Sequence, residues 1–149
     1  MSKHHTKIEW SRAGRAFDYD AYSRNHWWVF KEGERIEASA AAQFLGDPKK
    51  MDPEDAFVAS LSSCHMLTFL AICSRKGLSV ESYSDEAVGF LEKDEVGKLV
   101  ITRVELLPKV CFSGDVEVSN DLLRELHERS HHECFLANSV KTEITTIIG

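Results

Sequence analysis

The sequence contains little proline, little glycine and no excess of basic residues. Only 3 prolines and 8 glycines occur among 149 residues, a composition that excludes collagen-like and low-complexity disordered chains. Acidic residues outnumber basic residues by 24 to 18, and the net charge is -6. Such a chain has no broad basic surface that could release counterions from phosphates. We therefore expect no nucleic acid and no membrane among its partners.

The first ten residues lack a long apolar run. A secretory signal peptide needs roughly 7 to 15 apolar residues followed by a small-residue cleavage site, and this segment has neither. We therefore expect a cytoplasmic protein. Because the chain shows no internal repeat and no long linker, we also expect a single domain over residues 1–149, large enough to fold without disulfides.

Residues 52–77 carry the signals of one long helix. Asp52 can cap it, Pro53 suits the first helical position, and Gly77 can adopt the left-handed conformation just beyond a helix that ends near Lys76. Residues 56–73 include no Asp, Glu, Lys or Arg, which reaches the lower length of a membrane span. Polar side chains nevertheless interrupt this stretch: Ser60, Ser62, Ser63, His65 and Thr68. We therefore expect a buried central helix and not a membrane span.

The rest of the chain alternates between strand and helix patterns. Four segments predict strands, the first of them two or three antiparallel strands: residues 7–36, 78–91, 98–112 and 140–148. Pro108 indicates a sheet edge or a bulge. Asn120 can cap a second helix that runs to about Ser130. The order of these elements predicts an α+β domain whose sheet packs on helices.

Four cysteines occur: Cys64, Cys73, Cys111 and Cys134. In a reducing compartment cysteines are more often free, catalytic or metal-bound than disulfide-bonded. Cys64 and Cys73 lie nine residues apart on the central helix, which is about 900° of rotation and roughly 13 Å of rise, so they cannot bond to each other. Cys134 falls at the predicted amino end of a last helical turn, a position that lowers the pKa of a thiol.

Cys64 has two interpretations. A cysteine in a helix core is often a small buried apolar residue, and we interpret Cys73 and Cys111 as structural. The polar residues next to Cys64 favour a functional site instead. A reactive thiol must be ionised, and the helix dipole fades within the first turn, so a cation from elsewhere is required. The candidate cations are Arg12, Arg15, Arg24 and Arg35, of which Arg24 has the densest polar and aromatic surroundings.

Two segments resemble the OsmC/Ohr family of organic hydroperoxide reductases, and most closely its broad OsmC-like branch. Residues 52–67, which read DPEDAFVASLSSCHML, are similar to the family's Asn-Pro-Glu-Glu-Leu motif and the small-residue run into the peroxidatic cysteine. Residues 132–141, which read HECFLANSVK, are similar to the segment with the resolving cysteine. Residues 22–26, YSRNH, also look like this branch. The resemblance covers nearly the whole chain.

The resemblance implies a fold and a reaction. The fold would be OsmC-like α+β, with antiparallel sheets wrapped around two long central helices in an intertwined homodimer. Cys64 would attack an organic hydroperoxide and become a sulfenic acid, Cys134 would condense with it to a disulfide, and a dithiol reductant of the lipoyl type or a small thiol would restore both. A thiolate beside a resolving thiol is what reversible peroxide reduction requires. No cofactor is implied.

The resemblance also implies an arginine and a glutamate at the site. The glutamate matches Glu54, which would hold the arginine against the thiolate. Arg24 is our choice for the arginine, with Arg15 and Arg35 left open. Two positions depart from the best-known members, because His65 replaces a large apolar residue after the peroxidatic cysteine and Phe135 replaces a proline after the resolving one.

Two other functions compete with this hypothesis. Zinc accepts sulfur and imidazole ligands, which the chain offers as Cys64, His65, His131, His132, Glu133 and Cys134. Adjacent residues diverge by about 100° on a helix, however, and are poor chelators. The second alternative is a noncatalytic protein that binds a small apolar ligand among Trp27, Trp28 and Phe57.

Overall fold

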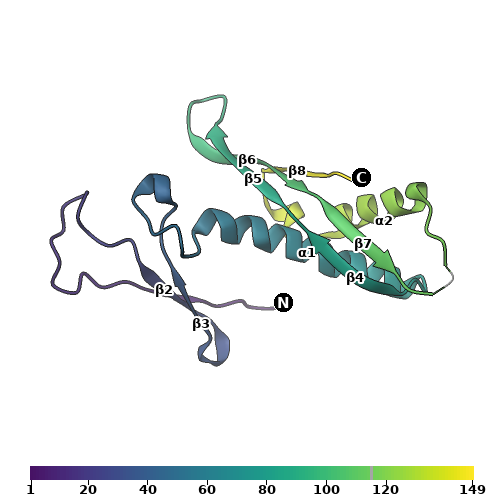
Figure 1. Ribbon diagram of the computed structural model, residues 1–149, viewed down its shortest axis with the longest axis horizontal. Helices are drawn as coiled ribbons and strands as arrows, with labels where there is room; N and C mark the ends of the chain where they lie inside the picture. Colours follow the sequence, from purple (N-terminus) through teal and green to yellow (C-terminus); the bar gives the residue numbers. More distant parts are fainter. Residues whose placement is uncertain (115) are drawn as a thin grey trace. The chain divides into compact units, whose positions relative to one another are not determined.

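The computed structural model describes residues 1–114 and 116–149 (Figure 1). The chain falls into two compact units, Met1–Ala56 and Phe57–Gly149. The first unit contains a small antiparallel sheet with the strand order β1 (Lys7–Glu9), β2 (His26–Val29) and β3 (Arg35–Ala38). Trp28 lies opposite Ile8 on one side and Ile36 on the other, so a large aromatic side chain pairs with β-branched neighbours. The predicted antiparallel strands of residues 7–36 are confirmed.

The long helix α1 (Pro53–Arg75) begins and ends where the sequence predicts. The Asp52 carboxylate accepts a hydrogen bond of 2.8 Å from the Asp55 N–H, as a helix cap does. At the other end, Gly77 has a φ of 72°, the left-handed conformation that a residue with a Cβ adopts at a cost. Local signals therefore define both ends of α1.

By length and composition α1 could cross a membrane, with a mean hydropathy of 1.8 over its most apolar window. The core helix of a folded protein has the same features. Within the second unit, Leu61, Phe69, Ile72 and Cys73 of α1 are buried among strands and the second helix. One face of α1 is thus buried as predicted, but much of the helix is not covered within the chain, where 28% of its most apolar window is buried.

The strands of the second unit form two sheets. Strands β4 (Val80–Asp85) and β7 (Pro108–Phe112) make an antiparallel pair, and β5 (Val88–Lys93), β6 (Leu99–Leu106) and β8 (Glu143–Thr146) make a sheet in the order β5-β6-β8. The predicted antiparallel arrangement holds for the pairs β4–β7 and β5–β6, whereas β8 runs parallel to β6. The last strand is also shorter than the predicted 140–148.

Each long strand predicted after α1 is in fact two strands. The chain breaks between β4 and β5 and again at Leu107, where it passes from one sheet to the other. The Asp85 carboxylate fixes both breaks, because it accepts a hydrogen bond of 2.7 Å from the Leu107 N–H and another from the Ser62 hydroxyl of α1. Pro108 begins β7, an edge position that needs no N–H, as the sequence indicates.

The second helix, α2 (Asn120–Glu133), begins one residue earlier than the predicted cap allows and ends three residues later than expected. Ser119, and not Asn120, is the cap, since the Ser119 hydroxyl accepts a hydrogen bond from the Leu122 N–H at 3.2 Å. Leu126 is buried on the inner face of α2, against Phe69 and Ile72 of α1. Figure 1 shows β4 and β7 crossing α1, and side chains of both strands pack with α1 and α2 around one buried cluster.

A second group of buried residues lies nearer the start of α1, where Leu61 packs against Val104 and Leu106 of β6. Gly89 of β5 allows α1 to approach closely, because a Cβ at this position would lie 2.4 Å from a methyl group of Val58. The sheet β5-β6-β8 therefore rests directly on the first turns of α1, and the strand pair β4–β7 rests on its last turns.

Candidate active site

Two cysteines that are 70 residues apart in the chain meet in the second unit. The Sγ atoms of Cys64 and Cys134 lie 2.9 Å apart. Both are free thiols, and a sulfur–sulfur bond measures about 2.05 Å, so a small approach would join them. Cys64 lies in the middle of α1, and Cys134 is the residue that follows α2.

The backbone around Cys134 leaves the helix and turns immediately. Cys134 is extended, with φ −69° and ψ 120°, and the chain then enters the short 3-10 helix η3 (Ala137–Ser139). The Ala137 N–H points at Cys134 Sγ over 3.5 Å, and the Asn138 N–H donates to the Cys134 carbonyl over 3.1 Å. This turn aims the thiol of Cys134 back toward α1.

Burial makes Cys134 a neutral thiol. Cys134 is 1% exposed, and this burial, together with the hydrogen bond to Cys64, raises the pKa of the Cys134 thiol. The N–H groups of Ala137 and Leu136 act in the opposite direction but less strongly. The predicted lowering of this pKa is therefore wrong. The residue lies at the carboxyl end of α2, where the helix dipole does not favour an anion.

Cys64 faces a cavity. A hollow of about 540 Å³ is lined by one face of α1 and by the chain beyond α2: Ser60, Ser63, Cys64, Leu67, Thr68, Ala71, Arg75, Glu133, Phe135 and Leu136. Its walls are mostly apolar, and Arg75 and Glu133 are the charged side chains among the residues that line it. A small molecule can therefore reach the Cys64 thiol, while the Cys134 thiol stays covered.

The other two cysteines lie away from this pair. Cys73 is buried in the core between α1 and α2, and burial raises the pKa of its thiol. Cys111 lies exposed on β7. Burial of Cys73 agrees with its interpretation as a structural residue, whereas Cys111, being exposed, does not contribute to the core.

His65 points toward α2, where it meets a histidine that the sequence analysis missed. His65 Nε2 and His127 Nδ1 are 2.9 Å apart, and the two rings are nearly parallel, with an interplanar angle of 6°. Burial lowers the pKa of each histidine to about 4, so the pair is uncharged at neutral pH. Its spacing of four residues from Leu123 was the available signal, since this spacing places His127 on the apolar face of α2.

The zinc hypothesis finds no cluster of ligands. Within residues 1–114 and 116–149, no three His, Cys, Asp or Glu side chains gather where a metal ion could bind. Cys64 and Cys134 do meet, but His65 is directed to His127. His131 lines a different hollow from the one beside Cys64.

In the first unit, Arg24 and Glu54 line one cavity of about 610 Å³. The Arg24 guanidinium donates to the carbonyl of Tyr22 over 2.7 Å and to the carbonyl of Tyr19. It also lies 3.7 Å from the centre of the Tyr22 ring, a cation–π contact. Arg24 is thus held by backbone and aromatic groups of its own loop. Glu54 lies in the first turn of α1.

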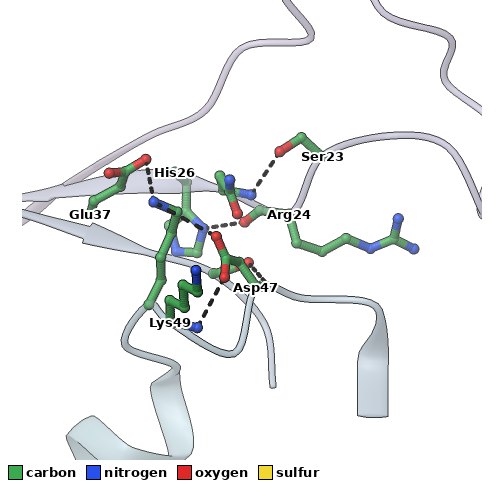
Figure 2. Close-up of polar contacts among 9 residues, drawn as sticks. Ser23, Arg24, His26, Glu37, Asp47 and Lys49 are labelled. Atoms are coloured by element: carbon green, nitrogen blue, oxygen red, sulfur yellow. Dashed lines mark hydrogen bonds and ion pairs between the residues drawn. The ribbon is translucent and has the colours of Figure 1, made fainter. Parts of the chain in front are cut away.

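Hydrogen bonds fix the backbone at Arg24 (Figure 2). His26 Nδ1 lies 2.7 Å from the Arg24 carbonyl, and His26 Nε2 accepts from the Trp28 indole N–H over 3.0 Å. Because a carbonyl only accepts and an indole only donates, His26 carries its proton on Nδ1. Figure 2 shows the Arg24 side chain extending away from His26 and Asp47, so its guanidinium is separate from that polar group.

The other candidate arginines lie elsewhere in this unit. Arg12 and Arg15 are exposed in the loop before β2, and Arg35 of β3 stacks over Trp27 at 4.2 Å. Arg24 is therefore the candidate that shares a cavity with Glu54.

The predicted apolar-ligand site has different walls. Trp10, Phe17, Tyr22 and Phe44 supply the aromatic rings of the 610 Å³ cavity, and not Trp27 or Trp28. Phe57 belongs to the second unit. Aromatic residues of the first unit do form a pocket, but the sequence analysis named the wrong ones as its walls.

An accessible thiol that faces a covered second thiol is typical of proteins with a redox-active pair of cysteines. The model of the OsmC-like protein family matches residues 46–148. The chain belongs to the OsmC-like protein family. The expected α+β fold with two helices is therefore confirmed, and so is the family that the cysteine segments resemble.

Solved structures agree with this assignment. An OsmC-like protein of unknown function from Vibrio cholerae is 45% identical, with a TM-score of 0.95 over 100% of both chains. An organic hydroperoxide resistance protein OsmC from Legionella pneumophila (16% identity, TM-score 0.71, 99% of this chain and 96% of that one) has the same fold. So does the organic hydroperoxide resistance protein OhrB of Bacillus subtilis (14%, 0.71, 99% and 98%). None of the curated protein sequences matches this chain.

Proposed function

We propose that this protein is a thiol peroxidase that reduces organic hydroperoxides and contributes to peroxide resistance. The observation that carries the proposal is the 2.9 Å separation of Cys64 Sγ and Cys134 Sγ beside an open cavity. Family membership supports a redox role, and two proteins of the same fold are named organic hydroperoxide resistance proteins.

The reaction proceeds in three balanced steps. The Cys64 thiolate attacks the distal oxygen of the hydroperoxide and the O–O bond breaks, so that Cys64 becomes a sulfenic acid. The alkoxide that leaves takes from water the proton that Cys64 released on ionising, and departs as an alcohol. The Cys134 thiol then attacks the sulfur of the Cys64 sulfenic acid, forming a disulfide and releasing water. Finally, a dithiol reductant of the lipoyl type, or two small thiols, reduces the disulfide and is itself oxidised.

The unequal exposure of the two thiols suits this order of events. Cys64 lines the cavity through which a peroxide enters, whereas Cys134 is buried and neutral and so does not compete for it. Once Cys64 is a sulfenic acid, the sulfur that resolves it already lies next to it. Rapid resolution protects Cys64 from further oxidation to sulfinic acid.

Arg24 and Glu54 complete the proposed machinery. We assign Arg24 as the cation that favours the Cys64 thiolate, and Glu54 as the carboxylate that orients Arg24. The support is that both line the same cavity of the first unit, and that Glu54 matches the glutamate of the family's motif. Arg24→Lys would keep the charge but lose the planar donors, and we expect slower peroxide reduction with unchanged disulfide reduction.

We further propose a cytoplasmic, soluble homodimer. Much of the apolar surface of α1 remains uncovered within one chain, since 28% of its most apolar window is buried and Leu67 is 60% exposed. Phe135, beside Cys134, is 82% exposed. A second copy would cover these side chains, as the resemblance implies.

Intact-mass analysis after one equivalent of tert-butyl hydroperoxide tests the proposed reaction. We expect a loss of two hydrogens, mapped by peptide analysis to a bond between Cys64 and Cys134. Cys111→Ser, which removes an exposed thiol outside the site, is the matched control and should give the same result. An unchanged mass, or oxidation confined to Cys73 or Cys111, would contradict the proposal.

A noncatalytic binder of small apolar ligands is the second candidate, favoured by the aromatic cavity of the first unit. This function predicts that Cys64→Ser keeps its ligand affinity, measured with a fluorescent apolar probe. It also predicts that wild-type protein does not consume hydroperoxide.

A further inference from the structure

The buried histidine pair lies between the two helices that carry the reactive thiols. His65 and His127 are 1% and 2% exposed, and each belongs to a different helix, α1 or α2. The ring of His127 also stacks on Phe69 of α1, with ring centres 4.4 Å apart. Buried imidazoles are costly unless they are hydrogen-bonded, and this pair obtains its hydrogen bond across the helix interface.

The pairing direction follows from the surroundings of His127. Its Nε2 atom is buried and has no hydrogen-bond partner. An N–H left unpaired there would cost more than an unpaired lone pair, so the proton of His127 belongs on Nδ1, which donates to His65 Nε2. His65 is thus the acceptor, and the contact is a single directed hydrogen bond between α1 and α2.

The histidine pair and the cysteine pair are two neighbouring ties between the same helices. On α1, His65 directly follows Cys64, so the two ties lie about 1.5 Å apart along the axis. On α2, His127 precedes Cys134 by seven residues, so the ties lie roughly 10 Å apart along the chain. Together, the histidine contact and the cysteine contact restrain α2 against both sliding along α1 and rotating over it. Either contact alone would leave one of these movements free.

We propose that the hydrogen bond between His65 and His127 is a positioning contact, which holds α2 on α1 so that Cys134 stays within reach of Cys64 while the two sulfurs are not bonded. This inference rests on the proposed function for its role in resolution. The contact raises the effective concentration of one thiol at the other, and the hydrogen bond itself takes no part in the sulfur chemistry. His65 and His127 are thus positioning residues.

The disulfide equilibrium tests the proposal without any peroxide. Purified protein is equilibrated with reduced and oxidised dithiothreitol, and the Cys64–Cys134 disulfide is quantified by mass. We expect His127→Phe, which keeps an aromatic ring against Phe69 but removes both nitrogens, to lower the equilibrium constant about tenfold, equivalent to about 30 mV. His127→Asn, whose amide nitrogen falls near the position of Nδ1, should recover most of the loss.

Peroxide treatment provides the second measurement. In His127→Phe we expect Cys64 to be lost at the wild-type rate but to accumulate as sulfinic acid, because the sulfenic acid waits longer for Cys134. If wild-type protein does not react with the peroxide, the proposed function fails, while the dithiothreitol equilibrium still judges the positioning contact.

Two controls separate positioning from general loss of stability. Leu126→Val loosens the packing of the same helix but keeps both imidazoles, and its disulfide equilibrium should stay within twofold of wild type. His65→Phe removes the hydrogen bond from α1 and should match His127→Phe. If His127→Phe does not fold, His127→Leu replaces it in the comparison with His127→Asn. A folded variant without the hydrogen bond that keeps the wild-type equilibrium constant would overturn the proposal.

Discussion

At the residue scale, burial gives two identical thiols different properties. Cys64 lines a cavity, and Cys134, 2.9 Å away, is covered and has a raised pKa. A nucleophile must be reachable, and a resolving thiol must wait unreacted until it is needed. The difference in exposure between Cys64 and Cys134 therefore suits the two roles that we propose for them.

Cys134→Ser separates the first step from the second. We expect Cys64 to be oxidised once at close to the wild-type rate, after which no disulfide forms and Cys64 proceeds to sulfinic acid. Turnover with a dithiol should fall by orders of magnitude, because residues that act as a unit cannot replace one another. Peroxide consumption assays with Cys111→Ser as the control measure this, and sustained turnover of Cys134→Ser would contradict a resolving role.

The histidine pair makes stability depend on pH. His65 and His127 have a folded-state pKa of about 4 against 6.5 without burial, so the unfolded chain binds more protons between these values. The stabilisation is therefore complete above pH 6.5 and is lost as the pH falls toward 4. The ionisable groups that act on His65 are His127 and His131 of α2, which oppose its protonation, and Asp85 of β4, which favours it.

Urea unfolding at pH 7 and at pH 4.5 tests this expectation. The midpoint should fall for the wild type, and it should fall less for the double variant His65→Gln, His127→Asn, which has no buried imidazole to protonate. An equal fall in both proteins would place the acid sensitivity elsewhere in the chain.

At the element scale, Asp85 decides where strands end. Its carboxylate binds Ser62 of α1 and the Leu107 N–H at the passage between β6 and β7. Asp85→Ala leaves both donors without their partner in a partly buried place, and we expect a loss of about 1–3 kcal/mol in the free energy of unfolding. Urea titration measures the loss.

Asp94→Ala is the matched control for Asp85→Ala. Asp94 also accepts from two backbone N–H groups, those of Val96 and Lys98, but in an exposed turn where water can replace it. Its removal should cost clearly less. A cost for Asp85→Ala no greater than that of Asp94→Ala would show that Asp85 does not stabilise the break.

These elements also show what the sequence could predict. The ends of α1 were correct because Asp52 and Gly77 act on neighbouring residues, so the signal lies in the local sequence. The strand breaks were missed because Asp85 acts on residues 22 or more positions away, and the apolar alternation continues through each break. The start of α2 was misplaced by one residue because Ser119 and Asn120 are both suitable caps.

The candidate site also has parts that the local sequence predicts and parts that depend on tertiary packing. The resemblance of two short segments identified Cys64 and Cys134, and their approach across 70 residues is a product of the packing of α1 against α2, which no local pattern encodes. His127 was missed because its partner lies 62 residues away. The roles of Arg24 and Glu54 stay predictions that variants must test.

At the scale of the whole molecule, the uncovered apolar surface of α1 argues for assembly. Leu67 and Phe135 both line the Cys64 cavity and are both exposed. We expect a dimer of twice the 16.9 kDa chain mass by sedimentation equilibrium. Leu67→Glu should shift the equilibrium toward monomers, and Val96→Glu, at a more exposed residue in the turn after β5, should not. A monomeric wild type at micromolar concentration would contradict this expectation.

The separation of Cys64 and Cys134 along the chain has a consequence for how the protein withstands heat. A bond between them would close a ring of about 70 residues that contains every element from β4 to α2, and restricting the unfolded chain in this way is worth about 4 kcal/mol if the effect is loop entropy. We expect the oxidised form to melt roughly ten degrees above the reduced form by calorimetry, and equal melting temperatures would contradict it. Treatment with an oxidant would then raise the melting temperature of the protein, and a reductant would lower it again.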